Sequence, residues 1–347
     1  MTPAEIDELV AGLPELARLD GFWDAMDARL ADGGAAVLAD VGIALRRNYG
    51  SRPVPHLRAA VDGLLRRLAL LPWPGHVPQV LRLAAGAGIA SRYVASVLAA
   101  GQDLTDLAPA LSSPDVPAVL RACLVQELVL RGARDPAPMP VGHPLSVLPG
   151  VRTELEEDPP LPRYGLNWTG RPDTLQPITI APAEPSADQA EVPPFMTGPA
   201  PYGSDAAVAT WANGAMEARL VELVEPLPAA AVPDVVAALG MEPPGAEVVG
   251  APLPVRAVWR LLFVAASLGG AHNLGEYGAY GRLAAWRTLG ALCGAGEHAR
   301  IGDIERRATE CEWYRFRVAD GIVHDLGLAA LGPGGRRLAV LVAVDPA

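Results

Sequence analysis

The densest group of side chains that could do chemistry lies on a glycine-rich stretch, residues 269–282. Its candidate catalytic residues are His272, Glu276, Tyr277, Tyr280 and Arg282. Residues four apart share a face of a helix, so His272 and Glu276 could be two metal ligands, or a base and the group that orients it. No third ligand stands at a diagnostic spacing. We therefore expect no metal, and favour a loop histidine that is hydrogen-bonded to backbone.

Glycines recur every three residues in this stretch, at Gly275, Gly278 and Gly281. On a helix, this spacing leaves a smooth stripe against which a neighbouring backbone can pack closely. In a loop, the same glycines would present N–H groups to an anion, with charge added by Arg282 or Arg287. The pattern is not the G-x-G-x-x-G fingerprint of dinucleotide sites. Close packing is the favoured interpretation, and a small-molecule pocket is the alternative.

Several reaction classes are excluded by what the chain lacks. It contains no lysine, and all 28 basic residues are arginine, as codon bias in a GC-rich genome would produce. Without lysine, no side chain can form a Schiff base or act as the phosphate-binding lysine of a nucleotide site. No G-x-S-x-G nucleophile elbow is present. A thiol dyad of Cys311 with His324 and Asp325 is a weak candidate, and no cofactor is indicated.

Composition restricts the compartment and the partners. The net charge of −11 argues against nonspecific binding to nucleic acid or to an anionic membrane. The paired arginines are expected to be solvated; they are Arg46–Arg47, Arg66–Arg67, Arg306–Arg307 and Arg336–Arg337. The three cysteines have no metal-site spacing, which is typical of reduced thiols. With an acidic start and no long apolar run, the chain is expected to be cytoplasmic.

Residues 1–134 have the pattern of an all-helical domain. Its first helix is marked by Thr2 as N-cap, Pro3 in the first turn and Glu5 three residues after the cap. Apolar residues then recur at helical spacing in short segments separated by proline or glycine. Paired short helices of this kind resemble HEAT-type repeats, although no fixed period is found.

Residues 135–204 form a proline-rich connector, which holds 16 of the 35 prolines. Proline at this density prevents regular helices and central strands. Short strands are expected at 151–155 and 175–180, and 182–189 is expected to be disordered.

Residues 205–347 have the pattern of an α+β domain. A β-hairpin is expected from 206–211 and 216–224, with a helix at 205–212 as the alternative. Further helices are expected at 233–239, 255–268, 281–293 and 301–309. The C-terminal part predicts an antiparallel meander of three strands, at 313–318, 323–331 and 337–344.

The stretch 256–287 carries a resemblance, through Trp259-Arg-Leu-Leu-Phe-Val-Ala-Ala-Ser and Glu276-Tyr-Gly-Ala-Tyr-Gly-Arg. With the apolar tail that ends at Asp345, it resembles an uncharacterised actinobacterial family of unknown function over residues 205–347. The resemblance implies an actinobacterial source and a soluble protein, and supplies no activity or site residue.

Two function classes follow from these patterns. The first is a noncatalytic protein-interaction module, because helical repeats are present and no complete catalytic motif is found. The second is a small-molecule enzyme of specialised metabolism with its pocket in residues 269–287. The expected partner is accordingly a protein or a small-molecule ligand.

Overall fold

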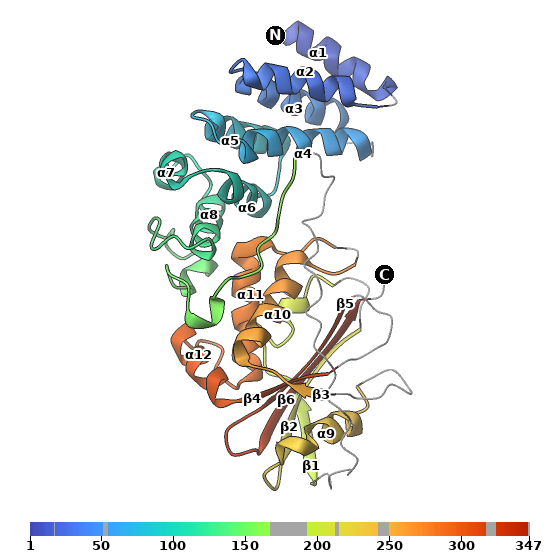
Figure 1. The fold of residues 1–347 in the computed structure, drawn as a ribbon, viewed down its shortest axis with the longest axis vertical. Coiled ribbons are helices and arrows are strands. Elements are labelled where there is room, and N and C mark those ends of the chain that lie inside the picture. The colour runs from blue at the N-terminus through green and yellow to red at the C-terminus, as the bar shows by residue number, and fades with distance from the viewer. Residues whose placement is uncertain are drawn as a thin grey trace. The chain divides into compact units, whose positions relative to one another are not determined.

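The computed structural model describes residues 1–16, 18–50, 55–166, 193–211, 215–241, 250–271, 273–316 and 324–345. The chain forms two compact units. Figure 1 colours the chain by residue number, from blue at the N-terminus to red at the C-terminus. The helical unit comprises the described residues of Met1–Ser146 and Pro162–Asp173. The sheet unit comprises the described residues of Val147–Leu161 and Thr174–Ala347. The N-terminal helical region and the α+β part that follows it are as the sequence predicts.

Eight α-helices make up most of the helical unit. They are α1 (Pro3–Gly12), α2 (Asp20–Ala31), α3 (Ala35–Tyr49), α4 (Pro55–Leu70), α5 (His76–Ala87), α6 (Ser91–Gly101), α7 (Leu104–Ser112) and α8 (Ala118–Leu130). The predicted start of α1 is confirmed, because Thr2 and Glu5 form a reciprocal capping box. This pair of contacts satisfies two of the N–H groups that a helix leaves unbonded at its N-terminus.

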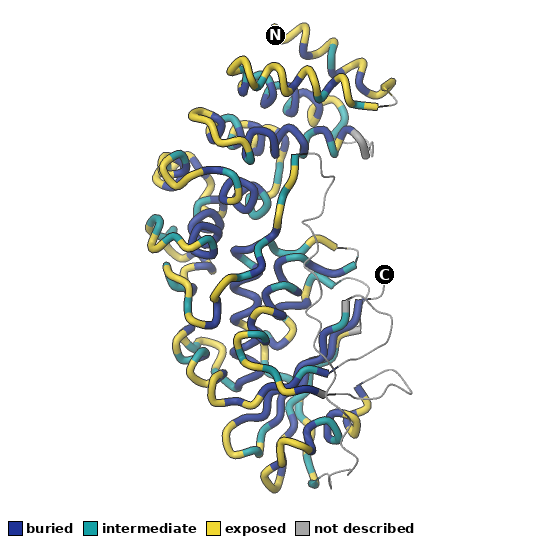
Figure 2. Tube along the Cα trace, viewed as in Figure 1, coloured by how far each residue is buried: buried dark blue, intermediate teal, exposed yellow. Residues whose placement is uncertain are grey.

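The helices of this unit pack as a two-row stack. Among the described residues, the extensive contacts link helices one or two positions apart, such as α3 with α5, α4 with α6, and α6 with α8. Each helix therefore packs mainly against helices that are near it in the sequence. Figure 2 shows the helices buried on the sides that face each other and exposed on the others.

The side chain of Gln102 joins two adjacent turns on one edge of the stack. Gln102, which follows α6, donates from Nε2 to the carbonyl oxygen of Ala69 in α4 at 2.8 Å and to that of Leu71 at 3.2 Å. A Cβ at Gly101 would clash with the backbone of Leu70, so only glycine permits this approach. The α4–α5 and α6–α7 turns therefore lie side by side.

The sheet unit contains six strands and four helices of regular length. The strands are β1 (Phe195–Pro199), β2 (Ala215–Leu223), β3 (Gly250–Pro252), β4 (Glu312–Phe316), β5 (His324–Leu331) and β6 (Arg337–Asp345). The helices are α9 (Val232–Ala238), α10 (Val255–Leu268), α11 (Tyr277–Leu292) and α12 (Ile301–Glu310). Short 3-10 turns occur at Glu154–Glu156, Ala206–Val208 and Ala229–Ala231.

The sheet is antiparallel throughout, with strand order β1-β2-β6-β5-β4-β3. Helix α9 packs on one face, in a core with Val221, Tyr314 and Val340. Helices α10 and α11 pack on each other and contact β4 and β6, and Figure 1 shows them across the sheet from α9. Both faces are covered, which explains why Trp313 and Tyr314 are each buried although they alternate along β4.

Several boundaries differ from the sequence prediction. The predicted hairpin is wrong, because 206–208 is a 3-10 turn and β2 pairs with β1 and β6. Residues 154–156 form a 3-10 turn where a strand is predicted. The three-strand meander is confirmed as β4, β5 and β6, within a larger sheet. The segments 175–180 and 182–189 lie outside the described residues. In the described part of the chain, no helix is long and apolar enough to cross a membrane.

Candidate functional site

The glycine-rich stretch forms a tight loop between α10 and α11. The loop folds over the end of α10, because the N–H of Gly275 donates to the Leu268 carbonyl at 3.0 Å and that of Glu276 to the Ala266 carbonyl at 2.8 Å. Helix α11 then begins at Tyr277, four residues before the predicted start. Of the candidate residues, His272 lies outside the described residues.

Three candidate residues lie at the start of α11. Glu276 is the N-cap residue, and Tyr277 and Tyr280 are half-buried on the first turn. Tyr277 has φ of 58°, in the left-handed region that side-chain-bearing residues rarely adopt. Such backbone strain persists only where the surrounding contacts hold it, and it is found often at functional sites.

The close-packing interpretation of the glycines is confirmed at two positions. A Cβ at Gly281 would stand 2.8 Å from Ser267 Cβ and 2.9 Å from its Cα. A Cβ at Gly275 would meet the backbone of Ser267 and Gly269. These glycines therefore let the loop and α11 approach the backbone of α10.

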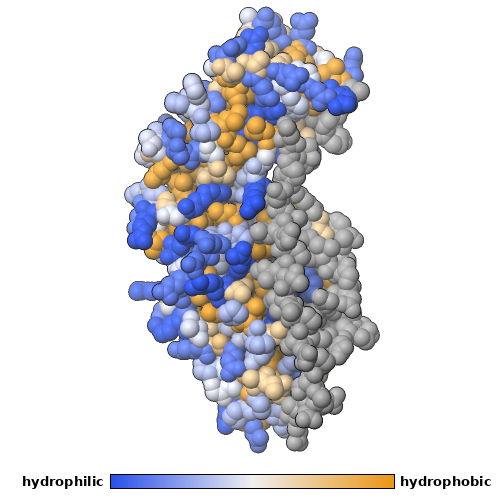
Figure 3. Space-filling model, in the orientation of Figure 1, coloured by the Kyte–Doolittle hydropathy of each residue, from blue (hydrophilic) through white to orange (hydrophobic). Residues whose placement is uncertain are grey.

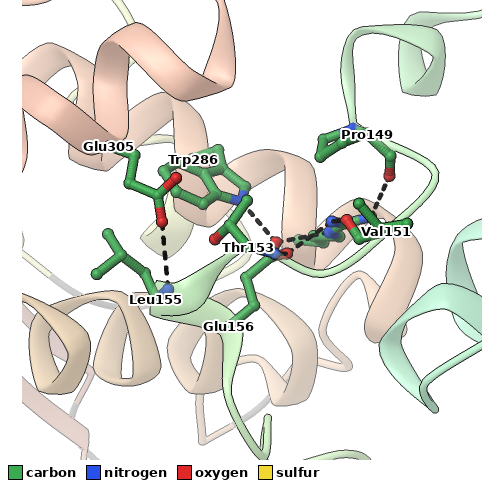
Figure 4. A network of polar contacts seen from close by, with 8 residues as sticks. Pro149, Val151, Thr153, Leu155, Glu156, Trp286 and Glu305 are labelled. Atoms are coloured by element: carbon green, nitrogen blue, oxygen red, sulfur yellow. Dashed lines mark hydrogen bonds and ion pairs between the residues drawn. The ribbon is translucent and has the colours of Figure 1, made fainter. Parts of the chain in front are cut away.

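Arg282 is fully buried and bound to residues 149–156 of the sheet unit. Its Nε lies 2.6 Å from Glu156 Oε1, and its Nη2 lies 2.6 Å from Glu156 Oε2, while both side chains have no exposed surface. Nη1 also donates to the Pro149 carbonyl at 3.0 Å and Nη2 to the Val151 carbonyl at 2.9 Å. Figure 4 shows these contacts converging from one bend of the chain.

The Glu156 carboxylate is further fixed by two donors. Trp286 Nε1, one turn along α11 from Arg282, lies 2.6 Å from Oε1. The N–H of Thr153 donates to Oε2 at 2.8 Å, and Glu305 on α12 accepts from the N–H of Leu155 at 3.4 Å (Figure 4). A guanidinium enclosed in this way stabilises the fold, so we interpret Arg282 as a structural residue.

A buried carboxylate that the sequence analysis missed lies against the same loop. Asp345, at the end of β6, has no exposed surface and accepts the N–H of Ala271 on Oδ2 at 2.8 Å. Its Oδ1 is buried with no hydrogen-bond partner among the described residues. A Cβ at Gly270 would clash with Oδ2, so glycine is required there. The signal in the sequence was a carboxylate that closes an apolar strand.

The thiol dyad gains no support from the structure. Burial raises the pKa of Cys311 to about 11, which keeps the thiol protonated near neutral pH and therefore a poor nucleophile. The side chain of His324 is outside the described part. Within the described residues, no group of three or more His, Cys, Asp or Glu side chains is arranged to hold a metal ion.

A second polar site lies in the helical unit, on α4. The prediction that Arg66 and Arg67 are solvated is wrong, because each is only 2% exposed. Arg66 Nη2 pairs with Asp62 Oδ2 at 2.8 Å, one turn earlier. Arg67 pairs with Asp27 of α2 at 2.5 Å, and its guanidinium carbon lies 4.1 Å from the ring centroid of Trp23. Paired and stacked arginines can be buried where unpaired ones cannot.

Both arginines also bind the backbone of an extended segment of the same unit. Arg66 Nη1 donates to the carbonyl oxygen of Gly165 at 2.9 Å. Arg67 Nη1 reaches the carbonyl oxygen of Leu166 at 3.4 Å. In Figure 1 this segment is the green trace that ends beside α4.

Helix α6 holds the preceding residue of that segment. Tyr164 donates its hydroxyl to Ser96 Oγ at 2.7 Å, and its ring meets that of Tyr93 edge-on with centroids 6.0 Å apart. Tyr93 in turn donates to Asp62 on α4. Burial raises the pKa of Asp62, although the contacts with Tyr93 and Arg66 act in the opposite direction. Burial likewise raises the pKa of the Tyr93 hydroxyl, with the Asp62 charge acting in the same direction.

These side chains form one surface, which we call the α4–α6 face. It consists of Asp62, Arg66, Arg67, Tyr93 and Ser96. It continues onto α8, where Arg131 pairs with the fully buried Glu127 at 2.6 Å and donates to the Ser96 carbonyl at 3.3 Å. The signal in the sequence was Asp62 one helical turn before the arginine pair, within the apolar stripe of this helix.

Comparison with known proteins identifies a family. The family model described as "Family of unknown function (DUF6183)" matches residues 20–347. The match reaches far beyond residues 205–347, where the sequence resemblance was found, and an actinobacterial source stays a prediction. No curated protein and no solved structure matches the chain. Because the family model covers most of its length, the chain belongs to the DUF6183 family.

Proposed function

We propose that this member of the DUF6183 family is a noncatalytic protein-interaction module, whose helical unit binds an extended segment of a partner polypeptide on the α4–α6 face. The observation that carries the proposal is the pair of buried arginines, Arg66 and Arg67, which donate to consecutive carbonyls of an extended chain. Guanidinium donors aimed at main-chain carbonyls recognise a polypeptide through its backbone.

The stack of helices suits this role. Near-neighbour packing builds long surfaces to which several successive helices contribute, and helical repeat proteins bind partners on such surfaces. The α4–α6 face takes side chains from two helices of the same row and extends to a third, α8. An extended segment can therefore contact several helices at once.

An exposed apolar edge offers a second contact area in the helical unit. Trp73 is 62% exposed, and Leu71 and Leu104 lie on the neighbouring turns that Gln102 joins. Figure 3 shows apolar residues at the visible surface of this unit between hydrophilic ones. Exposed aromatic and aliphatic side chains that gather in this way favour association with proteins.

The alternative is a small-molecule enzyme with its site in residues 269–287. Asp345, whose Oδ1 is buried without a partner among the described residues, and the left-handed Tyr277 favour that site. The buried position of Arg282 counts against it, because the residue meant to bind an anion is bound to Glu156. We therefore prefer the interaction module. The three cysteines are free and buried, which supports the further proposal that the protein works in the reducing cytoplasm.

Selection from a display library of random linear peptides tests the proposed function. The bait is the full-length chain with residues 162–166, which occupy the face, replaced by glycine and serine. The control is the same chain with Arg67→Gln, which keeps a polar side chain but removes the charge. We expect enriched peptides whose binding is lost with the Arg67→Gln bait. Enrichment of no peptide, or of peptides that bind both baits equally, would contradict the proposal.

A further inference from the structure

We propose that residues 162–166 are an intramolecular pseudo-ligand, and that the partner segment they replace carries a tyrosine followed by two residues that present their backbone carbonyls. The inference rests on the proposed function and names the ligand class of the same face. The binding mode is taken from the chain itself, because its own Tyr164, Gly165 and Leu166 contact Ser96, Arg66 and Arg67 of the α4–α6 face.

The burial and contacts of the segment indicate what a ligand of this face must present. Arg163 is exposed, so the side chain at this position is not recognised. The hydroxyl and ring of Tyr164 are both contacted, by Ser96 and Tyr93. Gly165 contributes its carbonyl, and its Cα is exposed. A tyrosine is therefore the specific anchor, and the arginines bind whatever backbone follows it.

The face does not depend on the segment for its own geometry. Arg66 is held by Asp62, and Arg67 is held by Asp27 and the ring of Trp23. All these residues lie on α2 and α4. When the segment leaves, the arginines keep their positions and become accessible to another carbonyl-bearing chain, which is the preorganisation that gives tight binding.

The segment can also leave the face without unfolding a helix or a strand. Residues 161–165 adopt neither helix nor strand, so their departure breaks no helix or sheet hydrogen bond. A tethered ligand acts at an effective concentration in the millimolar range, so it outcompetes a dilute ligand of equal intrinsic affinity. We therefore expect a trans ligand to bind weakly to the native chain and well once the internal segment is removed.

The test uses the full-length chain with residues 162–166 replaced by glycine and serine. The probe is a fluorescein-labelled peptide with the sequence of residues 158–166, and binding is followed by anisotropy. We expect the peptide to bind the replaced chain at least about tenfold more tightly than the native chain. A Tyr164→Phe peptide should bind about fivefold more weakly, and an Arg163→Ala peptide should bind as the parent does.

A second variant separates binding at this face from any effect on folding. Ser96→Ala in the replaced chain removes the acceptor for the Tyr164 hydroxyl and leaves the volume nearly unchanged. In that background the Tyr164→Phe peptide and the parent peptide should bind equally, and circular dichroism should confirm that all chains are folded. Equal discrimination with and without Ser96 would overturn the assignment of the anchor.

The remaining outcomes distinguish the inference from the proposed function. If library peptides bind the α4–α6 face but the 158–166 peptide does not bind the replaced chain, the inference fails and the proposed function stands. If the native chain forms a concentration-dependent dimer that the replacement abolishes, the face belongs to a second copy, and the inference of a different partner is overturned.

Discussion

Arg282 and Glu156 form a two-point ion pair with no exposed surface on either side chain, although 126 residues separate them in the sequence. The pair fastens the bend around residues 149–156 to α11 within the sheet unit. We therefore interpret Arg282, a candidate ligand-binding residue in the sequence analysis, as part of the core.

Removing the arginine should destabilise the protein severely. We expect Arg282→Ala to lower the free energy of unfolding by about 3–5 kcal/mol, because Glu156 is left buried without its ion-pair partner. The measurement is urea unfolding followed by circular dichroism. Arg287→Ala, an exposed position on the same helix, is the matched control and should change stability by no more than about 0.5 kcal/mol. A loss as small for Arg282→Ala would show that the pair is not structural.

A methyl group at Gly281 should force α10 and α11 apart. Its Cβ would stand 2.9 Å from the Cα of Ser267, which is backbone and cannot rotate away. We expect Gly281→Ala to cost about 1–3 kcal/mol of stability in thermal or urea unfolding.

The control for this substitution is Gly302→Ala on α12. A Cβ there has no neighbour within 4 Å, so the change should stabilise the helix by up to about 1 kcal/mol. Equal effects at the two glycines would contradict the close packing of α10 against α11.

The buried thiols should make stability fall at alkaline pH. Burial raises the pKa of Cys123 to about 12, against about 8.5 in an unfolded chain. The folded state retains the Cys123 proton to higher pH than the unfolded chain does. The contribution of this proton to the free energy of unfolding is therefore complete below about pH 8.5. It is lost at about 1.4 kcal/mol per pH unit as the pH rises toward the pKa of Cys123 in the folded state. We expect the native chain to lose stability faster than Cys123→Ala between pH 8.5 and 10, as measured by urea unfolding.

The same burial predicts slow chemistry at the thiols. Native protein at pH 8 should react with iodoacetamide at all three cysteines far more slowly than urea-unfolded protein, as followed by mass spectrometry. Fast alkylation of Cys311 in the native chain would revive it as a reactive residue.

Local patterns were sufficient for much of the fold. The Thr2 cap, the helix at 255–268 and the three C-terminal strands follow from capping chemistry and from the spacing of apolar residues, both of which act over short distances. The start of α11 was misplaced because Tyr277 adopts a backbone conformation that glycine would be expected to occupy.

The sites depended on partners distant in sequence. Arginine pairs are usually solvated, and Asp62 one turn earlier does not by itself mark Arg66 as buried, since the carbonyl that Arg66 binds is 99 residues away. Arg282 finds its carboxylate at still greater separation. Tertiary packing decides which ionisable groups become partners. The sequence analysis therefore placed its candidate site in the glycine-rich stretch and missed the one on α4.

Hydrogen–deuterium exchange of the full-length chain, with and without a peptide selected from the linear library, tests the central claim most directly. The account predicts slower exchange in α4 and α6 and faster exchange in residues 162–166, because the peptide takes the place of the internal segment. Slower exchange confined to residues 269–287 would contradict it, and would assign the ligand to the glycine-rich stretch.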